Sequence, residues 1–553
     1  KTNTLYTLKE GHARVAGESG SKKSRTVSRG QIISCTLNRD SLICTDPKGE
    51  LCSDAKITAL LKAAGYDVYV MDFRYFDKDG FNVLSYAYEK YQAGDTARAM
   101  NALNRFVEML KKGKEGSDDP YWNDNGGVMV RSPAQFLLNY LSAMQRGQEE
   151  YHLASVKSFL RQNRDSMIHK LAETIVKNSD VGHSAYNAIF SYNELLALPD
   201  KTYACVVSSA ISLIADFCSS DELLRMLSIS TFDVRNFYKR PCALFMVVPD
   251  ETNAYDMLVG YLIDTFYEIL IEEFGDLYQG KRRPHSRIHM ICDEIASIHI
   301  NDMSSKISAS RSREIEWTLI YQSDKQMEKS YPKDFGTILG NCRNMLFLGS
   351  SDYDILKSVS EQVGKTTYSD AQGDQNAALV SVADLRKMKK EWEYKDALVI
   401  SGPHLYCAQL TDYEQYPFLK KGAEPVVWEQ RILKRELKVY TPEDLYEDVK
   451  NSRFPMTGRG EKMLAERRQR EAACRQTNGG RVFSFKKAAG KEDSGQSRSA
   501  KADTPKSDYK INWEEDLKEI FGDMLADKFD DDDDLFDDDS LFDEDSWFDD
   551  EED

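Results

Sequence analysis

Short, mostly apolar runs place the strongest constraint on the fold of this chain of 553 residues. Runs of this length that are apolar throughout are typical of strands buried on both faces of a parallel sheet. Segments whose apolar residues recur at helical spacing, such as 53–64 and 253–274, separate several of these runs. The alternation predicts an α/β fold with a mainly parallel central sheet covered by helices. The expected strands are 12–16, 41–45, 66–73, 242–248, 287–292, 316–321, 344–349 and 396–401.

Strand-like runs are missing between residues 86 and 235. Instead, TARAMNALNRFVEMLKK (96–112) and AQFLLNYLSAM (134–144) repeat apolar residues at helical spacing. We therefore expect an all-α domain at 86–235, inserted between a first part (1–85) and a second part (236–452) of one sheet-containing domain. A chain of this length is expected to form two or three domains.

The C-terminal region has a different composition, with little to bury. Residues 453–511 are expected to be a flexible basic linker, and 512–553 an amphipathic helix followed by a disordered acidic tail. The tail from Asp530 to Asp553 holds 16 acidic residues and repeated Leu-Phe and Trp-Phe pairs, so residues 1–529 carry only -18 + 16 = -2 of the net charge. The acidity is thus local and does not exclude a nucleic-acid substrate.

The cysteines and the hydropathy indicate an intracellular, soluble chain. The 10 cysteines form no C-x-x-C pair, which is typical of a reduced compartment. We find no signal peptide and no run of about 18 apolar residues. The sequence begins at Lys1, a dozen residues before the first expected strand, so we expect that an N-terminal segment is missing.

The stretch GESGSKKS (17–24) follows the first expected strand and precedes an expected helix from Lys23 onward. This is the context of a phosphate-binding loop, written G-x-x-x-x-G-K-[ST]. Gly17, Lys23 and Ser24 fit the pattern, whereas Lys22 replaces the second glycine. Because glycine lets the backbone approach phosphate without a Cβ, the stem of Lys22 is expected to point outward and the loop to be strained. The added cation favours phosphate electrostatically.

Two acidic residues follow the apolar run RIHMIC. Asp293 is expected to hold magnesium through water, and Glu294 to polarise an attacking water. Gln322 ends the next expected strand and is placed to sense a γ-phosphate. Arg311 or Arg313 could reach a nucleotide bound by a neighbouring subunit. Taken singly, these residues are also compatible with strand-end caps and surface ion pairs.

Other chemistries find weaker support in the sequence. GKTT (364–367) resembles the end of a phosphate loop, but Val359 stands where the first glycine belongs, so we interpret it as a helix terminus followed by a turn. No H-E-x-x-H motif or zinc spacing and no G-x-S-x-G motif occurs.

Several strings together resemble the type IV coupling proteins of bacterial conjugation and secretion, the TraG/TraD-like ATPases. SLICTDPKGEL (41–51) is similar to the family's hallmark after the phosphate loop, and CDEIAS (292–297) to its Walker B segment. The match continues over about 12–420, through DPYW (119–122), ISASRSREIEWTLIYQS (307–323), ILGNCRNMLFLG (338–349) and VSEQVGKTT (359–367).

This resemblance implies a RecA-like P-loop domain with an all-α insertion. The family forms hexamers at the cytoplasmic face of the inner membrane, anchored by N-terminal transmembrane helices, and uses ATP and Mg²⁺ to pass a relaxase with single-stranded DNA, or effector proteins, to a secretion channel. The expected site residues are Gly17, Gly20, Lys22, Lys23 and Ser24 for phosphate, Ser24 and Asp293 for magnesium, and Lys23, Glu294, Gln322 and, in trans, Arg311 for catalysis.

Two alternatives remain open at this stage. The chain could act mainly as a docking receptor, with a degenerate nucleotide site and with the all-α domain and acidic tail binding cargo. It could also be a chromosome-segregation DNA pump of related fold, although DPKGE is not expected in that class.

Overall fold

The computed structural model describes residues 11–112, 120–160, 194–249, 254–280, 282–370, 373–391, 393–416, 419 and 423–450. The predicted linker at 453–511 and the predicted helix and acidic tail at 512–553 lie outside these residues.

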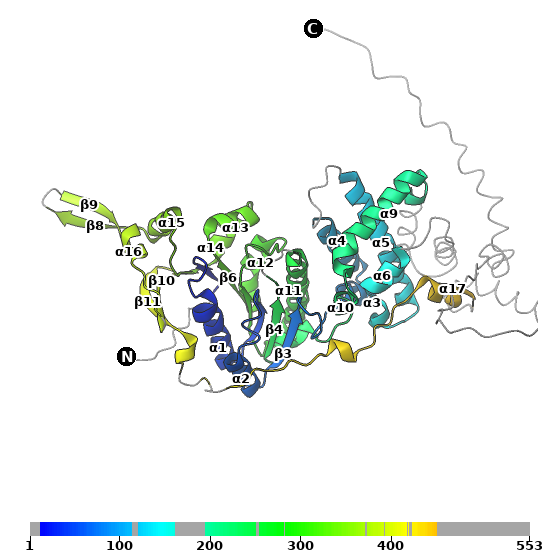
Figure 1. The fold of residues 1–553 in the computed structure, drawn as a ribbon, viewed down its shortest axis with the longest axis horizontal. Helices are drawn as coiled ribbons and strands as arrows, with labels where there is room; N and C mark the ends of the chain where they lie inside the picture. Colours follow the sequence, from blue (N-terminus) through cyan, green and yellow to red (C-terminus); the bar gives the residue numbers. More distant parts are fainter. Residues whose placement is uncertain are drawn as a thin grey trace, which may run out of the picture. The chain divides into compact units, whose positions relative to one another are not determined.

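The main sheet has nine strands, in the order β11-β10-β7-β1-β6-β5-β2-β4-β3 (Figure 1). All pairs from β7 to β3 are parallel, which confirms the predicted mainly parallel sheet. At one edge, β10 runs antiparallel to β7, and β11 runs antiparallel to β10. The strands are β1 Ala13–Ala16, β2 Ser41–Thr45, β3 Asp67–Asp72, β4 Cys242–Val247, β5 Ile288–Cys292, β6 Ile315–Tyr321, β7 Asn344–Phe347, β10 Tyr394–Ser401 and β11 His404–Thr411.

Strands that are distant in sequence become neighbours in this sheet. Val15 in β1 pairs with Ile320 in β6 on one side and with Leu346 in β7 on the other. The carboxyl ends of the parallel strands therefore meet at one edge, where the segments after β1, β2, β5 and β6 come together.

Helices cover both faces of the sheet. Ile320 belongs to the apolar cluster that also contains Ile33 of α1 (Arg29–Asn38) and Ile57 of α2 (Ala55–Ala63). Side chains alternate along a strand, and Trp317 accordingly faces the other way, with its ring 6.2 Å from that of Tyr267 in α11 (Asp256–Gln279). The helices between β5 and β10 are α12 Met303–Ser310, α13 Asp324–Ser330, α14 Phe335–Asn341, α15 Tyr353–Val363 and α16 Val382–Arg386.

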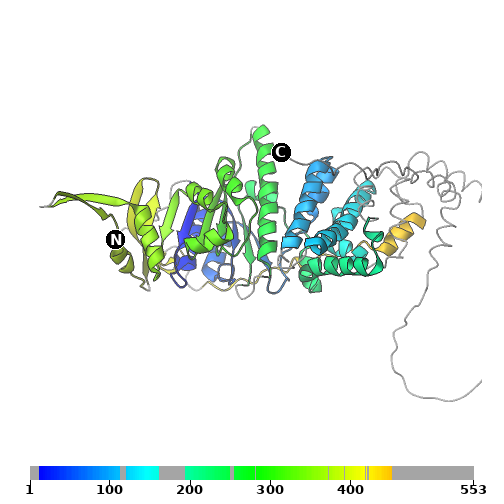
Figure 2. The same cartoon turned by 90° about the horizontal axis from the view of Figure 1, so that it is seen from above.

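The described residues between Ser85 and Pro241 contain helices and short turns but no strand, as predicted. Figure 2 shows these helices gathered together, coloured from blue to blue-green. By its contacts, this helical part belongs to the same compact unit as the sheet, so the domain limits at 86 and 235 stay predictions. The helices are α3 Ser85–Gln92, α4 Thr96–Lys112, α5 Pro120–Ala143, α6 Leu153–Leu160, α9 Asp200–Ala215 and α10 Asp221–Met226.

One described segment, Asp200–Cys218, is long and apolar enough to cross a membrane, with a hydropathy of 1.3. The sequence analysis did not predict a segment of this kind. A single segment of this kind is weak evidence for a membrane span, because helices inside soluble proteins share the same length and composition. About a third of this segment (33%) is buried within the protein, including Val206, Ala210 and Leu213.

The GKTT sequence ends a helix, as predicted, but the expected turn is wrong. Gly364 follows α15 with φ of 96°, and the chain passes directly into β8 (Lys365–Asp370), which pairs with β9 (Gly373–Ala378). A short helix, α17 (Pro442–Lys450), is the last described element.

Candidate functional site

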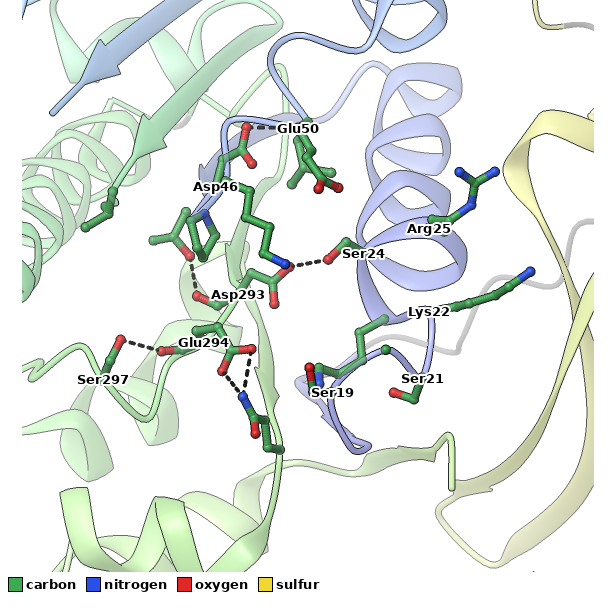
Figure 3. A pocket seen from close by; sticks show the side chains of 18 of the residues that line it. Ser19, Ser21, Lys22, Ser24, Arg25, Asp46, Glu50, Asp293, Glu294 and Ser297 are labelled. Carbon is green, nitrogen blue, oxygen red and sulfur yellow. Dashed lines mark hydrogen bonds between the residues drawn. The ribbon is translucent and has the colours of Figure 1, made fainter. Parts of the chain in front are cut away.

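A cavity of about 590 Å³ opens at the carboxyl edge of the sheet. Its walls come from the loop after β1, the segments after β2, β4, β5 and β6, and the region before β10. The lining residues are Ser19, Gly20, Ser21, Lys22, Lys23, Ser24, Arg25, Thr45, Asp46, Pro47, Lys48, Glu50, Leu51, Val248, Pro249, Asp256, Asp293, Glu294, Ser297, Ile298, Gln322 and Lys390. Figure 3 shows part of this lining.

The loop after β1 folds tightly because its glycines leave room for it. A Cβ on Gly17 would lie 2.6 Å from the hydroxyl of Ser21 and 3.1 Å from Leu348 Cβ. Gly20 has φ of +73°, in the left-handed region that glycine adopts without strain. After the loop, the chain makes a wide π-type turn, Lys23–Ser28, and continues as α1.

Lys23 is buried beneath this loop. Its ammonium donates to the carbonyl oxygens of Gly17 at 2.6 Å and Glu18 at 3.2 Å. Burial lowers its pKa, while the charges of Glu294 and Asp293 oppose that shift. The ammonium of Lys23 is thus positioned at the cavity, where an anion could replace the two loop carbonyls as its hydrogen-bond acceptor.

Asp293 lies opposite the loop, directly after β5. It accepts hydrogen bonds from the hydroxyls of Ser24 at 3.1 Å and Ser28 at 3.2 Å, and Figure 3 marks the bond to Ser24. Thr45 at the end of β2 donates to the backbone carbonyl of Asp293 at 2.8 Å. Burial, followed by the charge of Glu294, raises the pKa of Asp293 to about 6, and the hydrogen bond from Ser24 opposes the shift.

Glu294 and Gln322 face each other across the ends of β5 and β6. The amide of Gln322 lies 3.4 Å from both carboxylate oxygens of Glu294. Glu294 has φ of 55°, a left-handed conformation that is uncommon for glutamate. Residues with uncommon backbone conformations are frequent at functional sites. Here the hydrogen bond from the N–H of Ile295 to the carbonyl of Ile320 stabilises the conformation of Glu294.

Lys22 adopts a left-handed backbone conformation, with φ of 68° and ψ of 22°, which glycine adopts more readily than other residues. Its stem points outward, as predicted, and Figure 3 shows the side chain directed away from Asp293 and Glu294. The ammonium donates to the carbonyl of Glu391 at 2.7 Å and lies 3.4 Å from a carboxylate oxygen of Asp412. Binding of phosphate by Lys22 would therefore fall to its backbone.

Several lining residues received no role from the sequence. Asp46 and Lys48 lie in the DPKGE string, which was visible as a family signature but not as part of a site. Asp46 accepts hydrogen bonds at 2.9 Å from the N–H groups of Leu51 and Cys52, which shapes the turn after β2. Lys390 lies 367 residues after Lys23, and no local pattern links it to the loop.

Arg311 and Arg313 lie at the amino end of β6, whereas the cavity lies at the carboxyl ends of the strands. They form a short turn, Arg311–Arg313, just before β6, whereas Gln322 follows the end of that strand. The strand has 7 residues, and its ends are about 20 Å apart at the usual rise per residue. Arg311 is exposed and has no carboxylate partner among the residues that the structure describes. Neither arginine belongs to the cavity of its own chain.

The residues present fit a nucleoside triphosphate with Mg²⁺. The hydroxyl of Ser21 is buried in the loop and has no hydrogen-bond partner within the described part of the chain, so it is available to donate to a phosphate oxygen. Ser24 and Asp293 offer a hydroxyl and a carboxylate, and Mg²⁺ commonly uses one or two such ligands together with water and phosphate. No group of three or more His, Cys, Asp or Glu side chains suited to a metal occurs among the described residues.

Comparisons with known proteins agree with the sequence resemblance. A family model described as type IV secretory system conjugative DNA transfer matches residues 2–391, more than half of the chain. No curated protein matches the chain in a sequence search.

The chain is also similar to several solved structures. The bacterial conjugative coupling protein TrwBdeltaN70, in complex with sulphate, is 15% identical, with 74% of this chain and 88% of that chain covered and a TM-score of 0.49. The plasmid coupling protein TrwB with ADP and Mg²⁺ is 16% identical, with coverages of 74% and 87% and a TM-score of 0.49. VirB4 of Thermoanaerobacter pseudethanolicus is 13% identical, with coverages of 74% and 91% and a TM-score of 0.40.

Proposed function

The chain belongs to the type IV secretory system conjugative DNA transfer family, and from that premise we propose that it is an ATP-dependent coupling protein. It binds ATP and Mg²⁺ in the cavity described above and hydrolyses the nucleotide. The free energy drives a relaxase with single-stranded DNA, or effector proteins, into a type IV secretion channel.

The observation that supports this proposal is the meeting of three distant segments in a single cavity. Lys23, Asp293 and Gln322 follow β1, β5 and β6, which lie next to one another only in the folded sheet. A fortuitous match to a phosphate loop would not place a carboxylate pair and an amide across the same cavity. The arrangement has the parts that phosphoryl transfer needs, namely cations for the phosphates, a metal ligand and a group that orients water.

Each side chain has a role that follows from its position. Lys23 exchanges its bonds to the loop carbonyls for a phosphate oxygen, and Ser21 donates its hydroxyl to another. Ser24 and Asp293 hold Mg²⁺, which with the triphosphate supplies charge neutralisation at the reacting phosphorus. Glu294 orients the attacking water and accepts its proton. Gln322 holds the carboxylate of Glu294 in place and senses the γ-phosphate.

A ring of subunits would complete the site. Arg311 lies at the edge of the sheet opposite to its own cavity, so only a second copy of the chain can bring it to a nucleotide. We therefore propose that Arg311 acts in trans, and that the ring is the homo-hexamer that the family resemblance implies. We place this ring at the cytoplasmic face of the bacterial inner membrane, attached through N-terminal helices, in contact with the channel components.

Hydrolysis by the purified chain tests the proposal. We expect Mg²⁺-dependent ATP hydrolysis that single-stranded DNA stimulates and that Lys23→Ala abolishes. Lys333→Ala is the matched control, because Lys333 is an exposed lysine outside the cavity and should retain full activity. A wild-type chain without hydrolysis, or a Lys23→Ala variant with normal hydrolysis, would contradict the assignment.

The docking-receptor alternative retains one supporting observation, the lysine at a glycine position of the loop. It predicts nucleotide binding without turnover and loss of cargo binding when residues 530–553 are deleted. The acidic tail lies outside the described residues, so its role stays a prediction. Full cargo affinity after this deletion would remove the alternative.

A further inference from the structure

The segment that follows β11 lies against the phosphate loop and the first turn after it. We call Asp412, Tyr413 and Glu414 the clasp. Asp412 accepts hydrogen bonds from Arg25 at 2.8 Å and 3.0 Å, and its side chain is 2% exposed. Arg25 also pairs with Glu414 at 3.1 Å. The clasp thus holds the start of the loop helix through charge-assisted hydrogen bonds, which are among the stronger polar contacts in proteins.

Tyr413 strengthens the same contact one turn further along. Its hydroxyl donates to Asp54, which also pairs with Arg29 at 2.9 Å. The guanidinium groups of Arg25 and Arg29 lie 5.4 Å and 5.0 Å from the centre of the Tyr413 ring. Cations at this distance are attracted to the face of an aromatic ring. The loop helix is therefore tied to a segment about 390 residues away in sequence.

Lys22 joins this network from the one position where the phosphate loop departs from its usual pattern. A non-glycine residue in the left-handed region is strained, and the strain persists only where surrounding contacts hold it. The contacts of the Lys22 ammonium with Glu391 and Asp412 supply that hold. Glu391 precedes β10 and Asp412 follows β11, so both partners belong to the antiparallel edge of the sheet.

We propose that Lys22 is a positioning residue: its ammonium, held by Asp412 and by the carbonyl of Glu391, fixes the phosphate loop in the conformation that receives the nucleotide. This inference rests on the proposed function of the loop. The replacement of glycine by lysine then does not mark a degenerate site. The contacts of the Lys22 side chain hold the loop in place of the backbone freedom that glycine would supply. They also connect the phosphate loop with the segments next to β10 and β11.

Three substitutions at position 22 in the full chain separate this role from the other possibilities. Lys22→Met keeps the strained backbone and the apolar stem but removes the anchor, so we expect affinity for Mg²⁺-ATP to fall about tenfold. Lys22→Gly removes the strain together with the anchor, and it should bind within about threefold of the wild type. Lys22→Arg keeps a cation able to reach the same acceptors and should rescue the affinity lost in Lys22→Met.

The pattern of affinities, measured by calorimetry, decides between the interpretations. If the ammonium bound phosphate directly, Lys22→Gly would be as weak as Lys22→Met. If the lysine merely obstructed the loop, Lys22→Met would bind as the wild type does and Lys22→Gly would bind more tightly. Either result would overturn the positioning role. Asp412→Asn should weaken binding less in the Lys22→Met background than in the wild type, because the two substitutions remove a shared interaction.

Hydrogen exchange without nucleotide keeps the inference testable apart from nucleotide binding. We expect faster amide exchange in residues 17–25 of Lys22→Met than of the wild type, at unchanged thermal stability of the whole chain. A wild type that fails to bind Mg²⁺-ATP would refute the proposed function. Unchanged exchange in Lys22→Met would refute the anchor itself.

Discussion

The buried hydroxyl of Ser21 leads to a prediction in which stability and ligand affinity change in opposite directions. Ser21 is 4% exposed, and its hydroxyl has no hydrogen-bond partner among the residues that the structure describes. A buried hydroxyl without a partner costs about 1–3 kcal/mol of desolvation. Replacing Ser21 by Ala removes this cost and leaves only a very small cavity. We therefore expect Ser21→Ala to be more stable without nucleotide, by roughly 1 kcal/mol.

The same substitution should weaken nucleotide binding. A hydrogen bond to a charged acceptor contributes about 1.5–3 kcal/mol, which corresponds to a loss of roughly 10- to 100-fold in affinity. Thermal unfolding measures both effects: the apparent Tm should rise by about 2 °C without ligand, and the further rise with Mg²⁺-ATP should shrink. Ser19→Ala is the control for stability, since Ser19 is an exposed serine of the same loop.

The reasoning fails if Ser21→Ala destabilises the nucleotide-free chain and leaves the affinity unchanged. That outcome would show that the hydroxyl already has a partner in solution and does not meet phosphate.

Three further predictions concern catalysis, packing and pH. Glu294→Gln keeps the contact with Gln322 but removes the base, so hydrolysis should slow by about 10²- to 10⁴-fold with little change in Mg²⁺-ATP affinity. Single-turnover assays measure the rate of hydrolysis, and calorimetry measures the affinity. An equal loss of binding would contradict the role of Glu294 as the base. Asp79→Ala should destabilise the protein by about 3–5 kcal/mol in urea unfolding, because the buried carboxylate accepts hydrogen bonds from Arg431, Thr231 and the N–H of Val70; Asp77→Ala, at a partly exposed neighbour, should cost much less. Burial lowers the pKa of His12 and of His152 to about 4. Since the unfolded chain takes up these protons below its ordinary pKa of about 6.5, stability falls as the pH drops from about 6.5 to about 4, and each histidine should account for about 2 kcal/mol between pH 7.5 and pH 5. His152→Gln should flatten this dependence in urea unfolding at the two pH values, and an unchanged slope would count against it.

The sequence predicted the elements whose physical signature is local. SLICT was expected as a strand at 41–45 and forms β2 over those residues, because a short, mostly apolar run is typical of a strand buried on both faces of a parallel sheet. The long helix expected near 253–274 appears as α11, and the described residues between the two halves of the sheet form helices and turns. Asp293 and Glu294 were recognisable because two acids directly after a buried strand must lie at the edge of the sheet.

Other features lacked any local signal. β8, β9 and β11 carry polar or partly exposed residues, and only pairing with a neighbouring strand makes them strands. Lys48 and Lys390 join the cavity from segments that no spacing rule connects with the phosphate loop. The substitution at Lys22 was visible, but its consequence was not, because Asp412 lies 390 residues further along the chain.

The sequence by itself thus determined strands β1 to β7 and β10, the helical character of the segments between them and the residues with reactive side chains, since periodicity and residue type act over a few residues. Only the tertiary structure decided which strands and which side chains lie next to one another. The order of strands depends on contacts between residues hundreds of positions apart, and these contacts bring Lys23, Asp293 and Gln322 to one cavity while leaving Arg311 at the far edge of the same sheet.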